Sequence, residues 1–323
     1  MKQPLLFVSV LFLDLRMKLG LTIFLWGLLL SAYAQTAWQG FELDSVRSEV
    51  DAKWQPFYYW KAKKQDQPLV VVLHTWSGDY TQTNNSLAER TKAKGWNYIH
   101  PNFRGPNNHP EACGSELAIT DIDQSIDWAL ENLAVNSDSV FVIGASGGGY
   151  ATLVTFMKSR HRIRGFHAYV PISDLAAWYE ESLVRTPRYA QDVLGCTASE
   201  DSVLNESEAK RRSPLYWETP WEKRKDATLH LYTGVHDGYT GSVPITHSIN
   251  FYNKVLRDAG VKDTTKLVDD QTTIRLLTRQ KGTESDQFIG NRKVHLFKKW
   301  KNVSLTIFEG GHEMLEDIAL EML

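Results

Sequence analysis

The chain has 323 residues, 42% of them hydrophobic, and a formal net charge of -2 at pH 7. This length suits one large domain or two small ones, and the hydrophobic share is ordinary for a globular protein with a substantial core. The near-zero charge, without a basic block or a repeat, excludes the long-range attraction that a nucleic-acid partner would need.

The N-terminus has the pattern of a secretory signal peptide. Met17-Lys18 precedes the apolar run 19–30, and Ser31-Ala32-Tyr33-Ala34 supplies a cleavage site of the A-x-A kind. We therefore expect residues 1–34 to be removed after Ala34. The mature protein is then secreted or periplasmic and has no stable membrane contact.

Two alternatives to this signal peptide remain open. The apolar run could stay uncleaved as a membrane anchor. A second apolar run in residues 1–16 indicates either an extended signal or a true start at Met17 instead of Met1. N-terminal sequencing of the mature protein checks cleavage, because an N-terminus that still carries Lys18 or Leu19 contradicts it.

Cys113 and Cys196 are the only cysteines in the chain. Exported proteins meet oxidising conditions in which disulfides persist. A bridge over so long a loop would stabilise the fold by roughly 4 kcal/mol in the chain-entropy model. The sequence leaves open whether the two form a disulfide or remain separate thiols, and the mass change on reduction distinguishes these cases.

Strands and helices alternate along the mature chain after a short lead-in that ends near Lys53. Strands are expected at 56–62, 68–74, 96–103, 140–145, 163–172, 227–235 and 303–308, with an excursion strand near 293–297. Helices are expected at 85–94, 115–133, 148–160 and 244–259 and after residue 312, with a further one between 261 and 301. This alternation predicts an α/β fold whose mostly parallel central sheet has helices on both faces.

Residues 173–225 interrupt the alternation. They lack a clear period and carry many charges and a dense group of aromatic residues. We therefore expect a single catalytic domain over 35–323 with a small inserted cap at about 173–225.

The stretch Val140 to Tyr150 contains a G-x-S-x-G sequence between a strand pattern and a helix pattern. In a nucleophile elbow a strand ends in a sharp turn and a helix begins, so that the serine hydroxyl is exposed. Here Ser146 occupies the serine position, and Gly144 and Gly148 leave room for the close approach of strand and helix. The alternative is an ordinary glycine-rich turn.

A serine nucleophile needs a histidine base and a carboxylate that orients it. The chain order Ser146, Asp237, His312 fits, and each residue follows a predicted strand, so all three gather at one edge of the sheet. The competing acids Asp263, Asp269 and Asp270 follow no comparably clear strand, and His236 precedes the acid in the chain. Taken alone, Asp237 could be a turn residue and His312 a helix-cap residue.

Attack on a carbonyl creates an oxyanion that fixed N–H donors must stabilise. One donor is expected to be the backbone N–H of Gly147, directly after the nucleophile. The second should come from the loop His74-Thr75-Trp76-Ser77-Gly78, with Trp76 as first candidate and Thr75 as second. The Trp76 side chain either walls the pocket or is simply packed.

Several motifs together resemble the catalytic domain of the prolyl oligopeptidase-like α/β-hydrolases and the secreted carbohydrate esterases grouped with them. They span about residues 68–315: Leu73-His74, Asn102-Phe103-Arg104-Gly105, Gly144 to Gly149, Arg212-Ser213-Pro214-Leu215, Gly234 to Asp237 with Val243-Pro244, and Gly310-Gly311-His312. The resemblance implies an α/β-hydrolase fold and a Ser-His-Asp mechanism. No metal or cofactor is expected, because the sequence has no closely spaced cluster of His, Asp or Cys.

The sequence departs from this family in three ways. The family's acid usually stands two residues ahead of the Val-Pro pair, whereas five residues separate Asp237 from Val243-Pro244. The mature chain has no room for the propeller domain of the large peptidases, and it lacks a recognisable acidic pair for binding a peptide amino terminus. These departures favour ester cleavage over peptide cleavage.

The sequence thus predicts an exported serine hydrolase that cleaves carboxylic esters through an acyl-enzyme. Eleven tryptophans suggest stacking on sugar rings and therefore an acylated polysaccharide, although each one could equally be core packing. The alternatives are a prolyl oligopeptidase-type serine peptidase and a non-catalytic binding module on a hydrolase scaffold. Small-molecule or carbohydrate esters are the expected partners, and nucleic acid is not.

Overall fold

The structure is a computed structural model that describes residues 38–83, 85–278 and 286–323. The expected signal peptide, residues 1–34, lies outside these described residues. The chain divides into two compact units, residues 1–41 and 42–323, and all that follows concerns the second unit. Among the described helices, none combines the length and the apolar character that crossing a bilayer requires.

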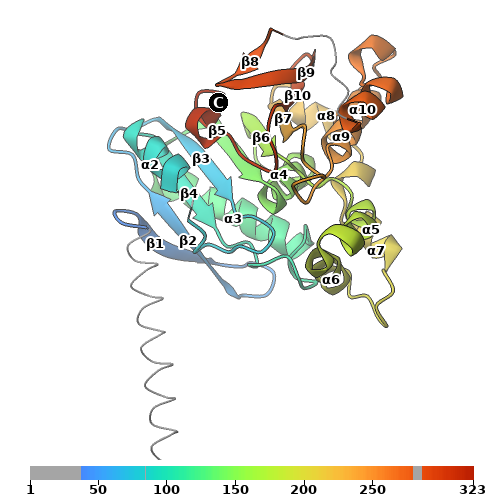
Figure 1. The fold of residues 1–323 in the computed structure, drawn as a ribbon. Helices are drawn as coiled ribbons and strands as arrows, with labels where there is room; N and C mark the ends of the chain where they lie inside the picture. Colours follow the sequence, from blue (N-terminus) through green and yellow to red (C-terminus); the bar gives the residue numbers. More distant parts are fainter. Residues whose placement is uncertain (1–37, 84, 279–285) are drawn as a thin grey trace, which may run out of the picture. The chain divides into compact units, whose positions relative to one another are not determined.

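Ten strands of the described chain form one sheet in the order β1-β2-β4-β3-β5-β6-β7-β10-β9-β8 (Figure 1). The strands are β1 (Glu42–Arg47), β2 (Trp54–Trp60), β3 (Gln67–Leu73), β4 (Asn97–Pro101), β5 (Val135–Ala145), β6 (Gly165–Tyr169), β7 (Thr228–Gly234), β8 (Phe288–Ile289), β9 (Arg292–Trp300) and β10 (Val303–Phe308). The run from β4 to β10 is parallel, and the strands at both ends of the sheet are antiparallel. The predicted mostly parallel sheet is confirmed.

Helices cover both faces of the sheet (Figure 1). Helices α3 (Glu116–Asn132), α4 (Gly147–Lys158) and α9 (Thr246–Asp258) share one hydrophobic core with every second residue of the central strands, for example Leu69, Val71 and Leu73 of β3. Helices α2 (Asn85–Ala93) and α11 (Glu316–Ala319) pack against each other, and α2 contacts β4. Burial of the central strands on both faces explains their nearly continuous apolar sequences.

The lead-in before Lys53 is not structureless, because it contains the edge strand β1, paired antiparallel with β2. The sequence ELDSVR gave no apolar alternation, since none of its residues is fully buried. A strand at the edge of a sheet is bonded on one side only and can remain polar. This is why the hydrophobic pattern missed it.

Residues between β6 and β7 form the cap, defined here as residues 173–225. It contains α5 (Leu175–Arg185), α6 (Pro187–Cys196), α7 (Glu206–Arg211), the short 3-10 turn Pro214–Tyr216 and α8 (Trp221–Arg224). Helices α5, α6 and α7 lie together (Figure 1). Their apolar residues, among them Trp178 and Val193, form a second core with Trp76 and Tyr150.

Two further elements lie between α9 and β8. These are the 3-10 turn Thr264–Lys266 and helix α10 (Asp270–Leu277), which accounts for the helix predicted between 261 and 301. The competing acids belong to this region, and two of them act as local caps: Asp263 accepts from the N–H of Thr265, and Asp269 accepts from the N–H of Thr272. Neither is placed to orient His312.

Candidate active site

Ser146 lies at the sharp junction between β5 and α4. Its backbone has φ 58° and ψ -120°, a conformation that costs a non-glycine residue about 1–3 kcal/mol. The N–H of Ser146 donates to the carbonyl of Tyr169 on β6 (2.9 Å), and its own carbonyl accepts from Tyr150 (2.8 Å). These bonds hold the strained turn that a nucleophile elbow requires.

Three positions around Ser146 must be glycine because other backbone atoms lie too close for a side chain. A Cβ on Gly144 would stand 2.3 Å from the carbonyl oxygen of Gly148, and one on Gly148 would stand 2.3 Å from that of Leu73. A Cβ on Gly147 would stand 2.2 Å from the backbone nitrogen of Trp76. The predicted roles of Gly144 and Gly148 are therefore explained, and Gly147 lies directly against the loop after β3.

Asp237 and His312 are hydrogen-bonded to each other. Asp237 Oδ2 lies 2.8 Å from His312 Nδ1. The other carboxylate oxygen of Asp237 accepts from the backbone N–H groups of Gly238 (2.9 Å) and Val243 (3.1 Å). Because the Asp237 side chain is fully buried and three bonds fix it, it holds the imidazole with Nε2 facing away from the carboxylate.

The five residues between Asp237 and Val243-Pro244 lie close to this pair. An added Cβ on Gly241 would stand 2.3 Å from Asp237 Oδ1 and 2.5 Å from the Cβ of His312. Ser242 places its Oγ 3.5 Å from His312 Nε2, and its carbonyl accepts from Trp178 Nε1 in the cap (2.9 Å). Despite this longer loop, the N–H of Val243 still donates to the carboxylate of Asp237.

Ser146, Asp237 and His312 follow β5, β7 and β10, three strands of the parallel part of the sheet, and lie at the same edge of the sheet. Bonds between strand ends keep this edge aligned: Ser146 donates to Tyr169, and the N–H of His236 donates to the carbonyl of Gly310 (3.0 Å). In the part of the chain that the structure describes, no hydrogen bond joins Ser146 Oγ to His312. Catalytic hydrogen bonds are often long in an enzyme without substrate.

The Trp76 N–H is free in the described part of the chain and lies beside Gly147. The carbonyl of the same peptide unit, Thr75 C=O, accepts from the N–H of Gly78 (3.1 Å). Because N–H and C=O point in opposite directions in a trans peptide, this bond directs the Trp76 N–H away from Gly78. With the N–H of Gly147, which begins α4, it forms a pair of donors beside Ser146.

The second oxyanion candidate, Thr75, has both of its donors bonded within the protein. Its N–H donates to Gln82 Oε1 (2.9 Å), and its hydroxyl donates to the same oxygen (2.8 Å). A donor already bonded within the protein is not available to an oxyanion. No sequence motif predicts this contact between Gln82 and Thr75, which forms only in the folded chain.

The indole of Trp76 is packed in the cap core. The residue is only 2% exposed, its ring contacts Trp178 edge-on at 4.6 Å, and its Nε1 donates to Asp192 Oδ2 (3.2 Å). Burial raises the pKa of the Asp192 carboxyl above its ordinary value, although the Trp76 bond lowers it. Asp192 was not foreseen from the sequence, because a lone acid in an irregular region gives no signal.

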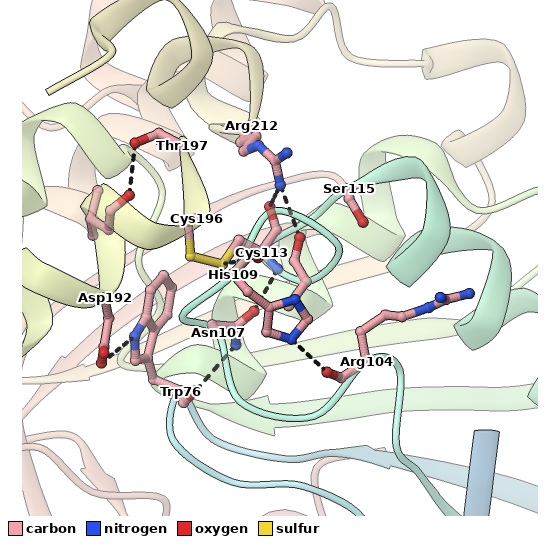
Figure 2. The surroundings of a disulfide bond; sticks show 12 residues. Trp76, Arg104, Asn107, His109, Cys113, Ser115, Asp192, Cys196, Thr197 and Arg212 are labelled. Atoms are coloured by element: carbon pink, nitrogen blue, oxygen red, sulfur yellow. Dashed lines mark hydrogen bonds between the residues drawn. A yellow bond between two sulfur atoms is a disulfide. The ribbon is translucent and has the colours of Figure 1, made fainter. Parts of the chain in front are cut away.

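Cys113 and Cys196 are joined by a disulfide, with their Cα atoms 5.9 Å apart (Figure 2). Cys196 ends α6 in the cap, and Cys113 lies in the loop between β4 and α3. The bridge therefore ties the cap to the sheet domain close to Trp76.

The described residues contain no group of three His, Cys, Asp or Glu side chains suited to a metal ion. His236 and His295 both contact Glu309, at 2.5 and 2.7 Å, but they lie on opposite oxygens of its carboxylate. This cluster links β9 to the loops that follow β7 and β10.

The sheet order, the elbow and the strand-end residues define an α/β-hydrolase. Residues 86–273, more than half of the chain, match the sequence profile described as the prolyl oligopeptidase family. The chain belongs to the prolyl oligopeptidase family and is a serine hydrolase, as its motifs predicted. No curated protein matches the sequence significantly.

Solved structures with the same fold include several peptidases. The acylaminoacyl peptidase of Pyrococcus horikoshii has 20% identity and a TM-score of 0.54, with 68% of this chain and 35% of that chain covered. For Porphyromonas gingivalis dipeptidyl peptidase 4 the values are 16%, 0.51, 68% and 30%, and for prolyl oligopeptidase B from Galerina marginata 13%, 0.53, 74% and 37%. This chain thus spans about a third of the length of each, and identities this low establish the fold alone.

Proposed function

We propose that the protein is a serine peptidase in which Ser146 attacks the carbonyl of a peptide bond. The membership of the prolyl oligopeptidase family supports cleavage of amides over cleavage of carboxylic esters. The solved peptidases with the same fold are consistent with this choice. The predicted preference for esters had rested on departures from the usual sequence pattern of the family.

The Asp237–His312 hydrogen bond carries the mechanistic part of this proposal. His312 Nε2 takes the proton from Ser146 Oγ as the oxygen bonds to the carbonyl carbon, while Asp237 stabilises the imidazolium. The N–H groups of Gly147 and Trp76 stabilise the oxyanion. The intermediate then expels the amine, which receives the proton from His312, and water releases the acyl group by the reverse transfers.

The carbohydrate hypothesis depended on tryptophans that could stack on sugar rings near Ser146. Trp178 is fully buried and bonded to Ser242, and Trp76 lies in the same core. Trp221 and Trp300 contact each other at 5.7 Å. Trp54 on β2 is the exposed tryptophan of the described chain, and β2 is separated from β5 by two strands. Among the tryptophans that the structure describes, none is therefore an exposed platform for sugar rings next to Ser146.

A substrate screen tests the peptidase proposal. Purified protein is offered N-blocked and free short peptide amides, including proline-containing ones, beside acetylated, feruloylated and methyl-esterified oligosaccharides. We expect a higher kcat/KM on at least one peptide amide than on any oligosaccharide ester. Turnover restricted to the esters would reject the peptidase and restore the ester hypothesis. An absence of fluorophosphonate labelling at Ser146 would instead favour a non-catalytic binding module.

We also propose that the protein is exported. The signal-like N-terminal sequence supports this, as does the disulfide between Cys113 and Cys196, because such bonds persist in oxidising compartments. The N-terminal sequencing described above tests it.

A further inference from the structure

The carbonyl of Trp76 is held by one residue from another loop. The N–H of Asn107 donates to this oxygen at 2.8 Å, and the side-chain Nδ2 of Asn107 lies 3.4 Å from it. Asn107 is 3% exposed and belongs to the loop between β4 and α3. The two peptide groups that flank Trp76 are therefore both held in place. Gly78 bonds to the carbonyl of the preceding one, that of Thr75, and Asn107 bonds to the carbonyl of the following one, that of Trp76.

Asn107 is in turn fixed by the disulfide loop (Figure 2). Its Oδ1 accepts from the backbone N–H of Cys113 (2.8 Å). Cys113 has a left-handed backbone with φ 53°, which a cysteine adopts only when its surroundings hold it. Those surroundings include the bond to Cys196 and two carbonyl contacts from Arg212 Nη1, to Ala112 at 3.0 Å and to Cys113 at 3.4 Å.

Helix α6 reaches Trp76 by a second route. Asp192, one turn before Cys196, accepts from the Trp76 indole, as described above. Gly195 presses against the same loop, since a Cβ there would stand 2.2 Å from the carbonyl oxygen of Asn108. The cap helix, the loop 107–113 and the oxyanion donor therefore form one connected unit that the disulfide closes.

We propose that Asn107 is a positioning residue for the oxyanion hole and that the Cys113–Cys196 disulfide holds it in place. Activity then depends on the oxidation state of the cap. This inference rests on the proposed roles of Ser146 and the Trp76 N–H. Reduction adds two electrons and two protons to the disulfide and gives two thiols, while dithiothreitol is oxidised to its cyclic disulfide. The freed loop lets the Trp76 peptide leave the position that serves the transition state.

Four forms of the full chain test the proposal with a p-nitrophenyl ester and the best peptide substrate: oxidised wild type, dithiothreitol-reduced wild type, Asn107→Ala and Cys113→Ser/Cys196→Ser. An oxyanion donor acts in the transition state, so its displacement lowers kcat and leaves KM nearly unchanged. We expect a kcat loss of about ten- to a hundredfold in the last three forms, less than the ~10²- to 10³-fold for deletion of a donor.

The matched control is Asn97→Ala. Asn97 is also a fully buried asparagine that fixes loops, since its Oδ1 accepts from the Ala62 N–H (2.9 Å) and its Nδ2 donates to the Ala134 carbonyl (3.1 Å). It lies at the amino end of β4, whereas Asn107 follows the carboxyl end. We expect Asn97→Ala to lower the Tm as Asn107→Ala does, but to keep the kcat of wild type below that Tm.

The outcomes separate this inference from the proposed function. Combining Asn107→Ala with the cysteine replacements should lower kcat by less than the product of the two losses, because both act on one loop. Equal kcat in oxidised and reduced wild type, or equal losses in Asn97→Ala and Asn107→Ala, would overturn the positioning role. Oxidised wild type that fails to react with fluorophosphonate at Ser146 would instead overturn the serine mechanism itself.

Discussion

Replacement of Ser146 by alanine is expected to lower kcat on every substrate by about 10⁴- to 10⁶-fold, the range seen when a serine nucleophile is removed from such a triad. The reason is that covalent attack needs the Ser146 oxygen at the elbow, where the φ of 58° exposes it. Single-turnover kinetics and labelling with a fluorophosphonate probe measure the loss. The substitution removes one oxygen from a partly exposed residue, so the Tm should change little.

Ser242→Ala is the control for the nucleophile, because Ser242 is the serine whose hydroxyl lies 3.5 Å from His312 Nε2. We expect this variant to retain covalent labelling with a fluorophosphonate, and Ser146→Ala to lose it. If labelling survives in Ser146→Ala and disappears in Ser242→Ala, the assignment of the nucleophile is reversed.

Asp237→Asn is expected to lower kcat by about 10⁴-fold, as in other triads where the acid becomes an amide. Oδ1 of the new side chain still accepts from Gly238 and Val243, so its NH₂ group must face His312 Nδ1. That nitrogen must then accept a hydrogen bond, which moves the proton of the neutral ring to Nε2. A base protonated at Nε2 cannot take the proton of Ser146.

Glu309→Gln provides the comparison for the acid. Glu309 also contacts imidazoles, those of His236 and His295, and it lies three residues before His312. Its loss should keep kcat close to that of wild type. A loss in Glu309→Gln as large as that in Asp237→Asn would show that any carboxylate at this edge matters, and would remove the special role of Asp237.

The sequence could predict those parts of the site that depend on local patterns. Ser146, Asp237 and His312 each follow a run of apolar residues that had to be a buried strand, and neighbouring parallel strands end at one edge. Their positions therefore followed from chain order. The polar edge strand β1 gave no such pattern, since its pairing with β2 leaves one side unbonded.

Contacts between distant segments could not be predicted. Thr75 was a reasonable candidate from the sequence, but in the folded chain its N–H donates to the side chain of Gln82. Asn107 and Asp192 gave no signal, because their roles depend on loops that meet only in space. The same holds for the cysteines, whose separation along the chain says nothing about the distance between their Cα atoms.

The bonds that hold the cap against the sheet domain affect how substrates reach Ser146. Among the bonds that connect the cap to the sheet domain, three reach three different loops: the disulfide to Cys113, the Asp192 bond to Trp76 and the Trp178 bond to Ser242. A hinged lid would have to break all of them at each turnover. We therefore expect the cap to keep its position during the reaction cycle and to limit the size of the substrate that can reach Ser146.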